Sequence, residues 1–122
     1  MEKAFEAATE QKVDAILPLS DPIALGNAAR IGALSLRYKI PLVSPFREIT
    51  DAGGLLSYGP DLSMLFRRSA SLVDQILKGA KPGDLPIGRP GHFELGANLQ
   101  TAQALNVTIP FSIVSRATYV RQ

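Results

Sequence analysis

The sequence predicts an α/β protein in which helices flank an open, mainly parallel sheet. Short apolar runs alternate with helical segments over the first 60 residues, a pattern typical of parallel sheets with right-handed crossovers. Residues 61–78 carry apolar side chains at the spacing of a helix that buries one face. The chain has 122 residues, of which 46% are hydrophobic and 20% charged, which is typical of one globular domain.

The chain is expected to begin with a helix over residues 2–12. Phe5 and Ala8 lie on one side of that helix, and glutamates lie on the other. The apolar run 13–19 then predicts a buried strand. Pro18 cannot donate a hydrogen bond to a neighbouring strand, so we expect this strand to lie at a sheet edge or to carry a bulge.

A helix is predicted from Ser20-Asp21-Pro22 to about Tyr38. Ser and Asp cap free backbone N–H groups, and proline suits the first helical turn. Small side chains are frequent on the face expected to be buried, which comprises Leu25, Ala29, Gly32 and Leu36.

The segment 40–60 predicts two short strands around a short helix. A strand over residues 40–43 ends at Pro45, and a helix over 46–52 leads into a Gly53-Gly54 turn. A further strand over 55–58 is expected to end at Gly59-Pro60.

Asp61 is expected to cap the clearest amphipathic helix, which runs to Lys78 with Gly79 in the C′ position. Its apolar face comprises Leu65, Phe66, Leu72, Val73, Ile76 and Leu77. Its polar face comprises Arg67, Arg68, Ser71, Asp74, Gln75 and Lys78.

The rest of the chain predicts a loop, one strand and two helices. Prolines and glycines indicate a loop over 80–91, and a strand follows over 92–97. Asn98 can cap a helix over 99–105, which Asn106 ends in the αL conformation. Pro110 is expected to open a last helix to about Val120.

The composition excludes several classes of site. Cysteine is absent and His92 is the single histidine, so we expect no disulfide, no metal site and no cofactor. The net charge is +2 and the basic residues are scattered, which argues against nucleic-acid binding. No run approaches the ~18 apolar residues of a membrane span, and no signal peptide is expected at the start of the chain.

Catalytic motifs are also absent. The glycines form neither a dinucleotide fingerprint nor a phosphate loop, and no nucleophile elbow is present. His92 follows Pro90-Gly91 and is expected to be an exposed loop or strand-edge residue rather than a triad base. We therefore expect a protein that binds without catalysing a reaction.

Candidate ligand-binding residues follow from the predicted sheet, because ligands bind beyond the carboxyl ends of parallel strands. An aspartate could accept a hydrogen bond from a ligand amine or hydroxyl, and an arginine could pair with a ligand carboxylate. Serines could donate hydrogen bonds, and aromatic rings could stack on a flat ligand. The residues expected there are Ser20, Asp21, Ser44, Phe46, Arg47 and Tyr58.

Each of these candidates also has a purely structural explanation. Ser20 and Asp21 could only cap the helix, and Phe46 could belong to the core. Arg47 could be a solvated charge on a helix face, and Tyr58 could fill the space beside Gly59. The sequence leaves both explanations open.

Most of the chain resembles the ABC transporter substrate-binding proteins related to tryptophan- and tyrosine-binding lipoproteins. The order and spacing of several segments carry this resemblance. They are GGLLSYGPD at 53–61, ILKGAKPGDLP at 76–86, FEL at 93–95, NLQTA at 98–102 and ALNVTIP at 104–110.

The resemblance implies the C-terminal portion of a type I periplasmic-binding-protein fold, in which two lobes close on a small ligand. It implies that residues 1–60 belong to the second lobe, that 61–80 form a helix of the first lobe, and that 81–122 cross over and return to the second lobe. It further implies that the full-length protein binds a small polar or aromatic solute for an ABC permease, in the periplasm or another extracytoplasmic space.

Two other functions stay open at this point. A ligand-sensing domain of a regulator or receptor would use the same cleft, and a small α/β enzyme would need a nucleophile–base pair that the sequence lacks. The apolar face of helix 61–78 also leads us to expect that the 122-residue chain binds ligand weakly and pairs with a second copy through this helix.

Overall fold

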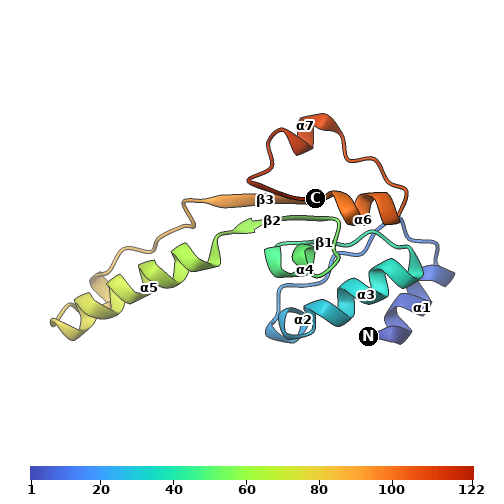
Figure 1. Cartoon of the computed structure of the whole chain (residues 1–122). Coiled ribbons are helices and arrows are strands. Elements are labelled where there is room, and N and C mark those ends of the chain that lie inside the picture. The colour runs from blue at the N-terminus through green and yellow to red at the C-terminus, as the bar shows by residue number, and fades with distance from the viewer. The chain divides into compact units, whose positions relative to one another are not determined.

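The computed structural model describes all 122 residues as two compact units, one formed by residues 1–59 with 94–122 and the other by residues 60–93. Figure 1 labels the helices and strands along the chain. In chain order they are α1 (Glu2–Glu10), α2 (Pro22–Gly26), α3 (Ala28–Tyr38), β1 (Val43–Ser44), α4 (Arg47–Asp51), β2 (Leu56–Pro60), α5 (Leu62–Leu77), a 3-10 turn (Pro82–Asp84), β3 (Phe93–Asn98), α6 (Leu99–Ala104), α7 (Phe111–Val114) and β4 (Tyr119–Arg121).

The four strands form one open sheet in the order β1-β2-β3-β4. The pairs β1–β2 and β3–β4 are parallel, with Ser44 opposite Ser57 and Gly96 opposite Tyr119. Strand β2 leads toward α5 and β3 returns from it, so these two neighbours run in opposite directions (Figure 1). The predicted α/β class with an open sheet is confirmed, and the sheet is mixed with two parallel pairs.

The prediction of a buried strand over residues 13–19 is wrong. Only Ile16 pairs, in an isolated parallel bridge with Leu42. Leu17 is 67% exposed and Leu19 is 82% exposed. Pro18 has no N–H to donate, so the segment cannot extend its pairing along β1. The bridge does lie beside β1 at the end of the strand order, as expected for a proline-containing segment.

The helix predicted from Pro22 to Tyr38 is divided at Asn27, which has non-helical backbone angles (φ −113°, ψ 19°). Its start is confirmed, because the Asp21 side chain caps α2. The predicted buried face of α3 is wrong except at Gly32, since Ala29 and Leu36 are exposed. The break turns α3 relative to a continuous helix, so that its buried face comprises Ile31, Gly32, Leu34 and Ser35.

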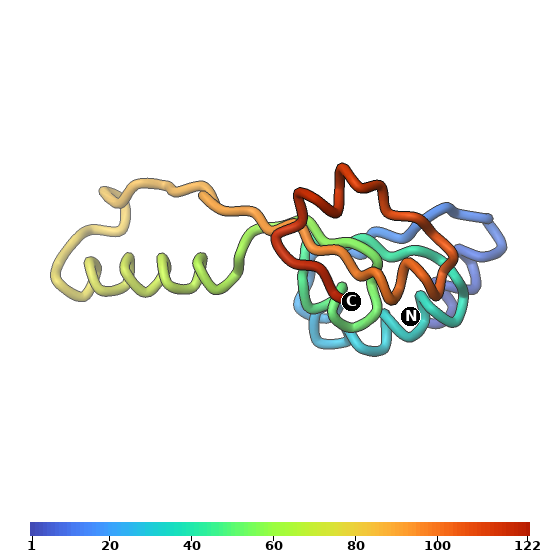
Figure 2. The backbone as a smooth tube through the Cα atoms, turned by 45° about the horizontal axis from the view of Figure 1, so that its top comes forward, coloured from blue at the N-terminus to red at the C-terminus, as the bar shows by residue number.

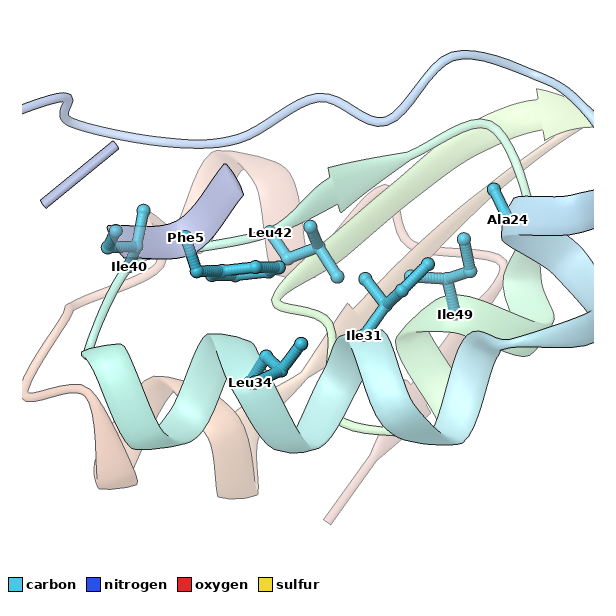
Figure 3. Close-up of a cluster of buried hydrophobic side chains, with 7 residues drawn as sticks. All are labelled: Phe5, Ala24, Ile31, Leu34, Ile40, Leu42 and Ile49. Carbon is cyan, nitrogen blue, oxygen red and sulfur yellow. The ribbon is translucent and has the colours of Figure 1, made fainter. Parts of the chain in front are cut away.

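Two apolar clusters hold the sheet-containing unit together. Figure 1 shows α1, α2 and α3 on one side of the strands and α7 on the other. Figure 3 shows the first cluster, in which side chains from α1, α3 and α4 converge on Leu42. Its members are Phe5, Ala24, Ile31, Leu34, Ile40, Leu42 and Ile49. The second cluster comprises Leu55, Ala97, Ala102 and Ile109.

Helix α5 forms as the sequence predicts. The Asp61 carboxylate accepts a hydrogen bond from the Met64 N–H at 3.1 Å, and Gly79 ends the helix at φ +101°. Figure 2 traces α5 and the chain that returns beside it, and the Arg68 guanidinium donates to the Arg89 carbonyl at 3.0 Å. No residue of α5 is buried. None of the helices combines the length and apolar character that crossing a membrane requires.

The last helix predicted from Pro110 to Val120 is wrong in its second half. Helix α7 ends at Val114, and the chain then forms β4 against β3. The Thr118 N–H donates to the Leu95 carbonyl at 2.7 Å at the start of this pairing. Residues 118–120 are two β-branched side chains and a tyrosine, which favour a strand once an open strand edge is available.

Candidate functional site

A pocket of about 290 Å³ lies where β1 ends, next to the segment that precedes α2. It is lined by Leu17, Pro18, Leu19, Ser20, Val43, Ser44, Pro45 and Tyr58. Three of the six predicted site residues, Ser20, Ser44 and Tyr58, line this pocket. All of the lining residues belong to the unit formed by residues 1–59 and 94–122.

The polar side chains that line this pocket differ in how deeply they are buried. Ser44 is buried, and its Oγ accepts a hydrogen bond from the Phe46 N–H at 3.0 Å, so its own hydrogen remains for a second partner. Ser20 and Tyr58 are exposed at the rim. A tyrosine ring beside serine hydroxyls can hold a flat apolar group while the hydroxyls orient a polar one.

Asp21 stands beside the pocket but does not line it. Its Oδ1 accepts a hydrogen bond from the Ala24 N–H at 2.8 Å, which caps α2. This capping bond uses one of its carboxylate oxygens, and the side chain is half-buried. Asp21 therefore carries the structural role that the sequence left open, and its role toward a ligand stays a prediction.

Phe46 and Arg47 also lie outside the pocket lining. Phe46 packs against the first apolar cluster. The guanidinium of Arg47, the first residue of α4, lies over the Tyr119 ring, with Cζ 4.0 Å from the ring centroid. Its Nε is 3.4 Å from the Asp51 carboxylate. Their contacts to a ligand remain predictions.

Sequence reasoning missed the apolar side of this pocket. Leu17, Pro18 and Leu19 were expected in a buried strand, yet they line the pocket. Pro18 was the signal that could have revealed this, because a residue that cannot pair in a sheet interior leaves its neighbours available for another surface. Tyr119, which holds Arg47, was missed because the sequence placed it in a helix.

The arrangement is suited to binding. His92 is exposed, and it does not belong to the unit whose residues line the pocket. No group of three or more His, Asp or Glu side chains is close enough to hold a metal ion. The pocket thus offers an apolar surface, hydroxyl groups and an aromatic ring.

Comparisons with known proteins agree with a binding role. The family model described as "ABC transporter substrate binding protein" matches residues 1–121. No curated protein matches the sequence.

Three solved structures resemble the chain. A conserved domain protein from Vibrio cholerae O1 biovar El Tor is 27% identical with a TM-score of 0.90. An ABC domain from Streptococcus pneumoniae in complex with L-Trp is 28% identical with a TM-score of 0.88. In both cases the match covers 98% of this chain and 40% of the solved one. A ligand-free, open substrate-binding protein from Clostridium difficile shares the fold, with 17% identity and a TM-score of 0.66. This match covers 99% of this chain and 40% of the solved one.

Proposed function

This chain belongs to the family of ABC transporter substrate-binding proteins, and from that premise we propose that it forms part of the solute-binding component of an ABC importer. The family gives the chain a solute-binding role. For the full-length protein we propose that it serves an ABC importer, binds a small polar or aromatic solute and passes it to an ABC permease. It acts in the periplasm or another extracytoplasmic space. It binds its solute without catalysing a reaction.

One observation carries this proposal. Ser20, Ser44 and Tyr58 come together around a pocket with a largely apolar lining, where β1 ends at Ser44 and where its parallel pairing with β2 ends at Ser57. Such a position is where open α/β sheets bind their ligands. The chain spans 40% of the length of the solved relatives, so we propose that this pocket is one side of a larger cleft.

The division of the chain follows from the same proposal. Residues 1–60 belong to the second lobe, the helix within 61–80 belongs to the first lobe, and 81–122 return to the second lobe. The compact unit of residues 60–93 supports the separation of the 61–80 helix from residues 1–59, and it also includes residues 81–93 of the crossover loop.

L-tryptophan is the first probe of ligand binding, because a relative of similar fold is described in complex with it. Titration of the isotopically labelled chain with millimolar L-tryptophan is expected to shift the NMR signals of Ser20, Ser44 and Tyr58. Tyr58→Ala is expected to weaken binding about 2- to 10-fold, because an aromatic contact contributes about 0.5–1.5 kcal/mol beyond its buried area. Tyr38→Ala is the matched control and leaves binding unchanged.

Two further variants of this experiment test the charged candidates. Asp21→Asn keeps a capping oxygen for α2 while removing the charge, and Arg47→Gln removes the guanidinium. Loss of a charged hydrogen-bond partner costs about 1.5–3 kcal/mol, so binding of a zwitterionic probe should fall at least about 10-fold. Unchanged affinity in both variants would remove Asp21 and Arg47 from the site. If L-tryptophan does not shift the NMR signals of Ser20, Ser44 and Tyr58 in the wild-type chain, this pocket is not a site for L-tryptophan.

We also propose that a second copy of the chain covers the apolar face of α5. Phe66 is 74% exposed and Leu77 is 82% exposed, although six large apolar side chains share this face. Burying six such side chains is worth roughly 9–18 kcal/mol at about 1.5–3 kcal/mol each, which is comparable with the net stability of a domain. An exposed apolar surface of this kind favours association.

Analytical ultracentrifugation at micromolar concentration is expected to show association of the 122-residue chain. Phe66→Ser combined with Val73→Ser should shift it toward monomer, because both side chains are exposed on the apolar face. Arg67→Ser, on the polar face, is the matched control and should leave association unchanged. A monodisperse wild-type monomer that binds no hydrophobic dye would contradict the proposed pairing.

A further inference from the structure

Tyr119 lies in a space that glycine creates on the neighbouring strand. It is opposite Gly96 in the parallel pair β3–β4. A Cβ atom at position 96 would overlap the Tyr119 ring and its hydroxyl group. The ring therefore lies directly against the backbone of β3, and any side chain at position 96 would displace it.

The Tyr119 ring and hydroxyl both contact Arg47 at the start of α4. The Arg47 Cζ atom lies 4.0 Å from the centre of the ring, a cation–π arrangement. The hydroxyl donates to the Arg47 carbonyl oxygen at 3.4 Å and lies 3.2 Å from the Ser57 Oγ of β2. Tyr119 thus connects β4, β2 and α4 through one side chain.

These contacts surround the corner between β1 and α4, which we define as residues 44–47. Ser44 and Pro45 of this corner line the pocket. The Ser44 Oγ accepts a hydrogen bond from the Phe46 N–H within the corner. Ser57 is the register partner of Ser44 and precedes Tyr58, which also lines the pocket. The corner is therefore held by Ser44 at its start and by Tyr119 at its end.

The Tyr119 phenol keeps its proton near neutral pH. Burial raises the pKa of its hydroxyl above the ordinary value of 10.0, while the hydroxyls of Ser57 and Thr50 offset part of this rise. The protonated phenol is consequently a donor for the Arg47 carbonyl.

We propose that Tyr119 is a positioning residue for the solute pocket, which fixes the corner 44–47 by holding Arg47 and by joining it to Ser57. Gly96 is part of this arrangement because it makes room for the ring. The inference rests on the proposed function of the pocket, and it assigns Tyr119 no contact with the solute. It makes the pocket rim dependent on a strand at the far end of the sheet order.

The first experiment measures the corner without any ligand. Tyr119→Phe removes the hydroxyl and keeps the ring, whereas Tyr119→Leu removes both. Amide hydrogen exchange at Phe46 is expected to accelerate about 2- to 10-fold in Tyr119→Phe, the range for loss of one neutral hydrogen bond. The Arg47 Nε–H signal should move in Tyr119→Leu, because the ring current is lost.

Tyr38→Phe is the matched control, since its hydroxyl lies 3.5 Å from Glu6 on the α1–α3 side of the unit. It should leave the amide exchange of Phe46 and the Nε–H signal of Arg47 unchanged. Unchanged Phe46 exchange in Tyr119→Phe would overturn the proposal, even if Tyr119→Leu fails to fold. Equal acceleration at amides throughout the core would also overturn it, because that indicates general destabilisation.

The second experiment measures affinity for L-tryptophan by NMR titration. Tyr119→Phe is expected to bind about 3-fold more weakly than the wild-type chain and Tyr38→Phe equally well. A mobile corner with unchanged affinity would overturn the positioning role. If the wild-type chain does not bind this probe, that result counts against the proposed ligand, and the exchange of Phe46 still decides whether Tyr119 fixes the corner.

Discussion

Leu42→Ala is expected to lower the free energy of unfolding by about 2–5 kcal/mol, the usual range for truncating a fully buried leucine. Leu42 is 0% exposed and lies where α1, α3 and α4 converge in the first apolar cluster. Its carbonyl oxygen also accepts the Leu55 N–H at 2.8 Å, so the surrounding backbone cannot easily collapse into the space left by the side chain. Both features favour the upper part of that range.

Urea denaturation followed by circular dichroism measures this loss. Ile87→Ala is the matched control, because Ile87 is fully exposed and its truncation should change stability by less than about 0.5 kcal/mol. Equal stabilities of the two variants would show that the cluster around Leu42 is not the main core of the sheet-containing unit.

Gly59→Ala is expected to lower the free energy of unfolding by about 3 kcal/mol, the upper part of the range for overpacking. Gly59 lies in β2, where an added Cβ would overlap the carbonyl oxygen of Pro45. That oxygen belongs to the backbone, so it cannot be displaced without moving the corner 44–47. Because Pro45 lines the pocket, the same variant should also weaken binding of L-tryptophan.

Gly91→Ala is the control for this variant, since no atom beyond its chain neighbours lies within 4 Å of the Cβ position at residue 91. Its stability and its affinity for L-tryptophan should match those of the wild-type chain. Denaturation and NMR titration of the two variants check both effects. A Gly59→Ala chain with wild-type stability would mean that β2 and Pro45 are not packed as closely as the structure has them.

Local sequence determined the capped helix ends and the character of α5. Asp21, Asp61 and Asn98 were predicted as caps, and each accepts a hydrogen bond from a backbone N–H three residues later. Gly79 and Asn106 adopt the positive φ angles expected of residues that end helices. Capping and helical periodicity depend on residues within about one turn, so a single sequence contains the information they need.

The candidate site was only partly accessible from sequence. Ser20, Ser44 and Tyr58 were predicted because they lie at or just after the ends of apolar runs, and the structure does bring them to one pocket, where the pairing of β1 with β2 ends. The leucines at 17 and 19 were missed because an apolar run looks the same whether it is buried in a sheet or lines a surface pocket. Only the absence of pairing beyond Ile16 distinguishes the two cases.

Tertiary structure alone decided the division of the second helix, the strand β4 and the neighbours of Arg47. Residues 119–121 become a strand because β3 offers an open edge, which no local pattern reveals. Tyr119 then reaches Ser57 and Arg47, which are 62 and 72 residues away in sequence. Strand pairing and side-chain stacking depend on partners that are distant in sequence. The sequence by itself therefore determined the capped helix ends and α5, whereas the assembled sheet decided which side chains lie around the pocket.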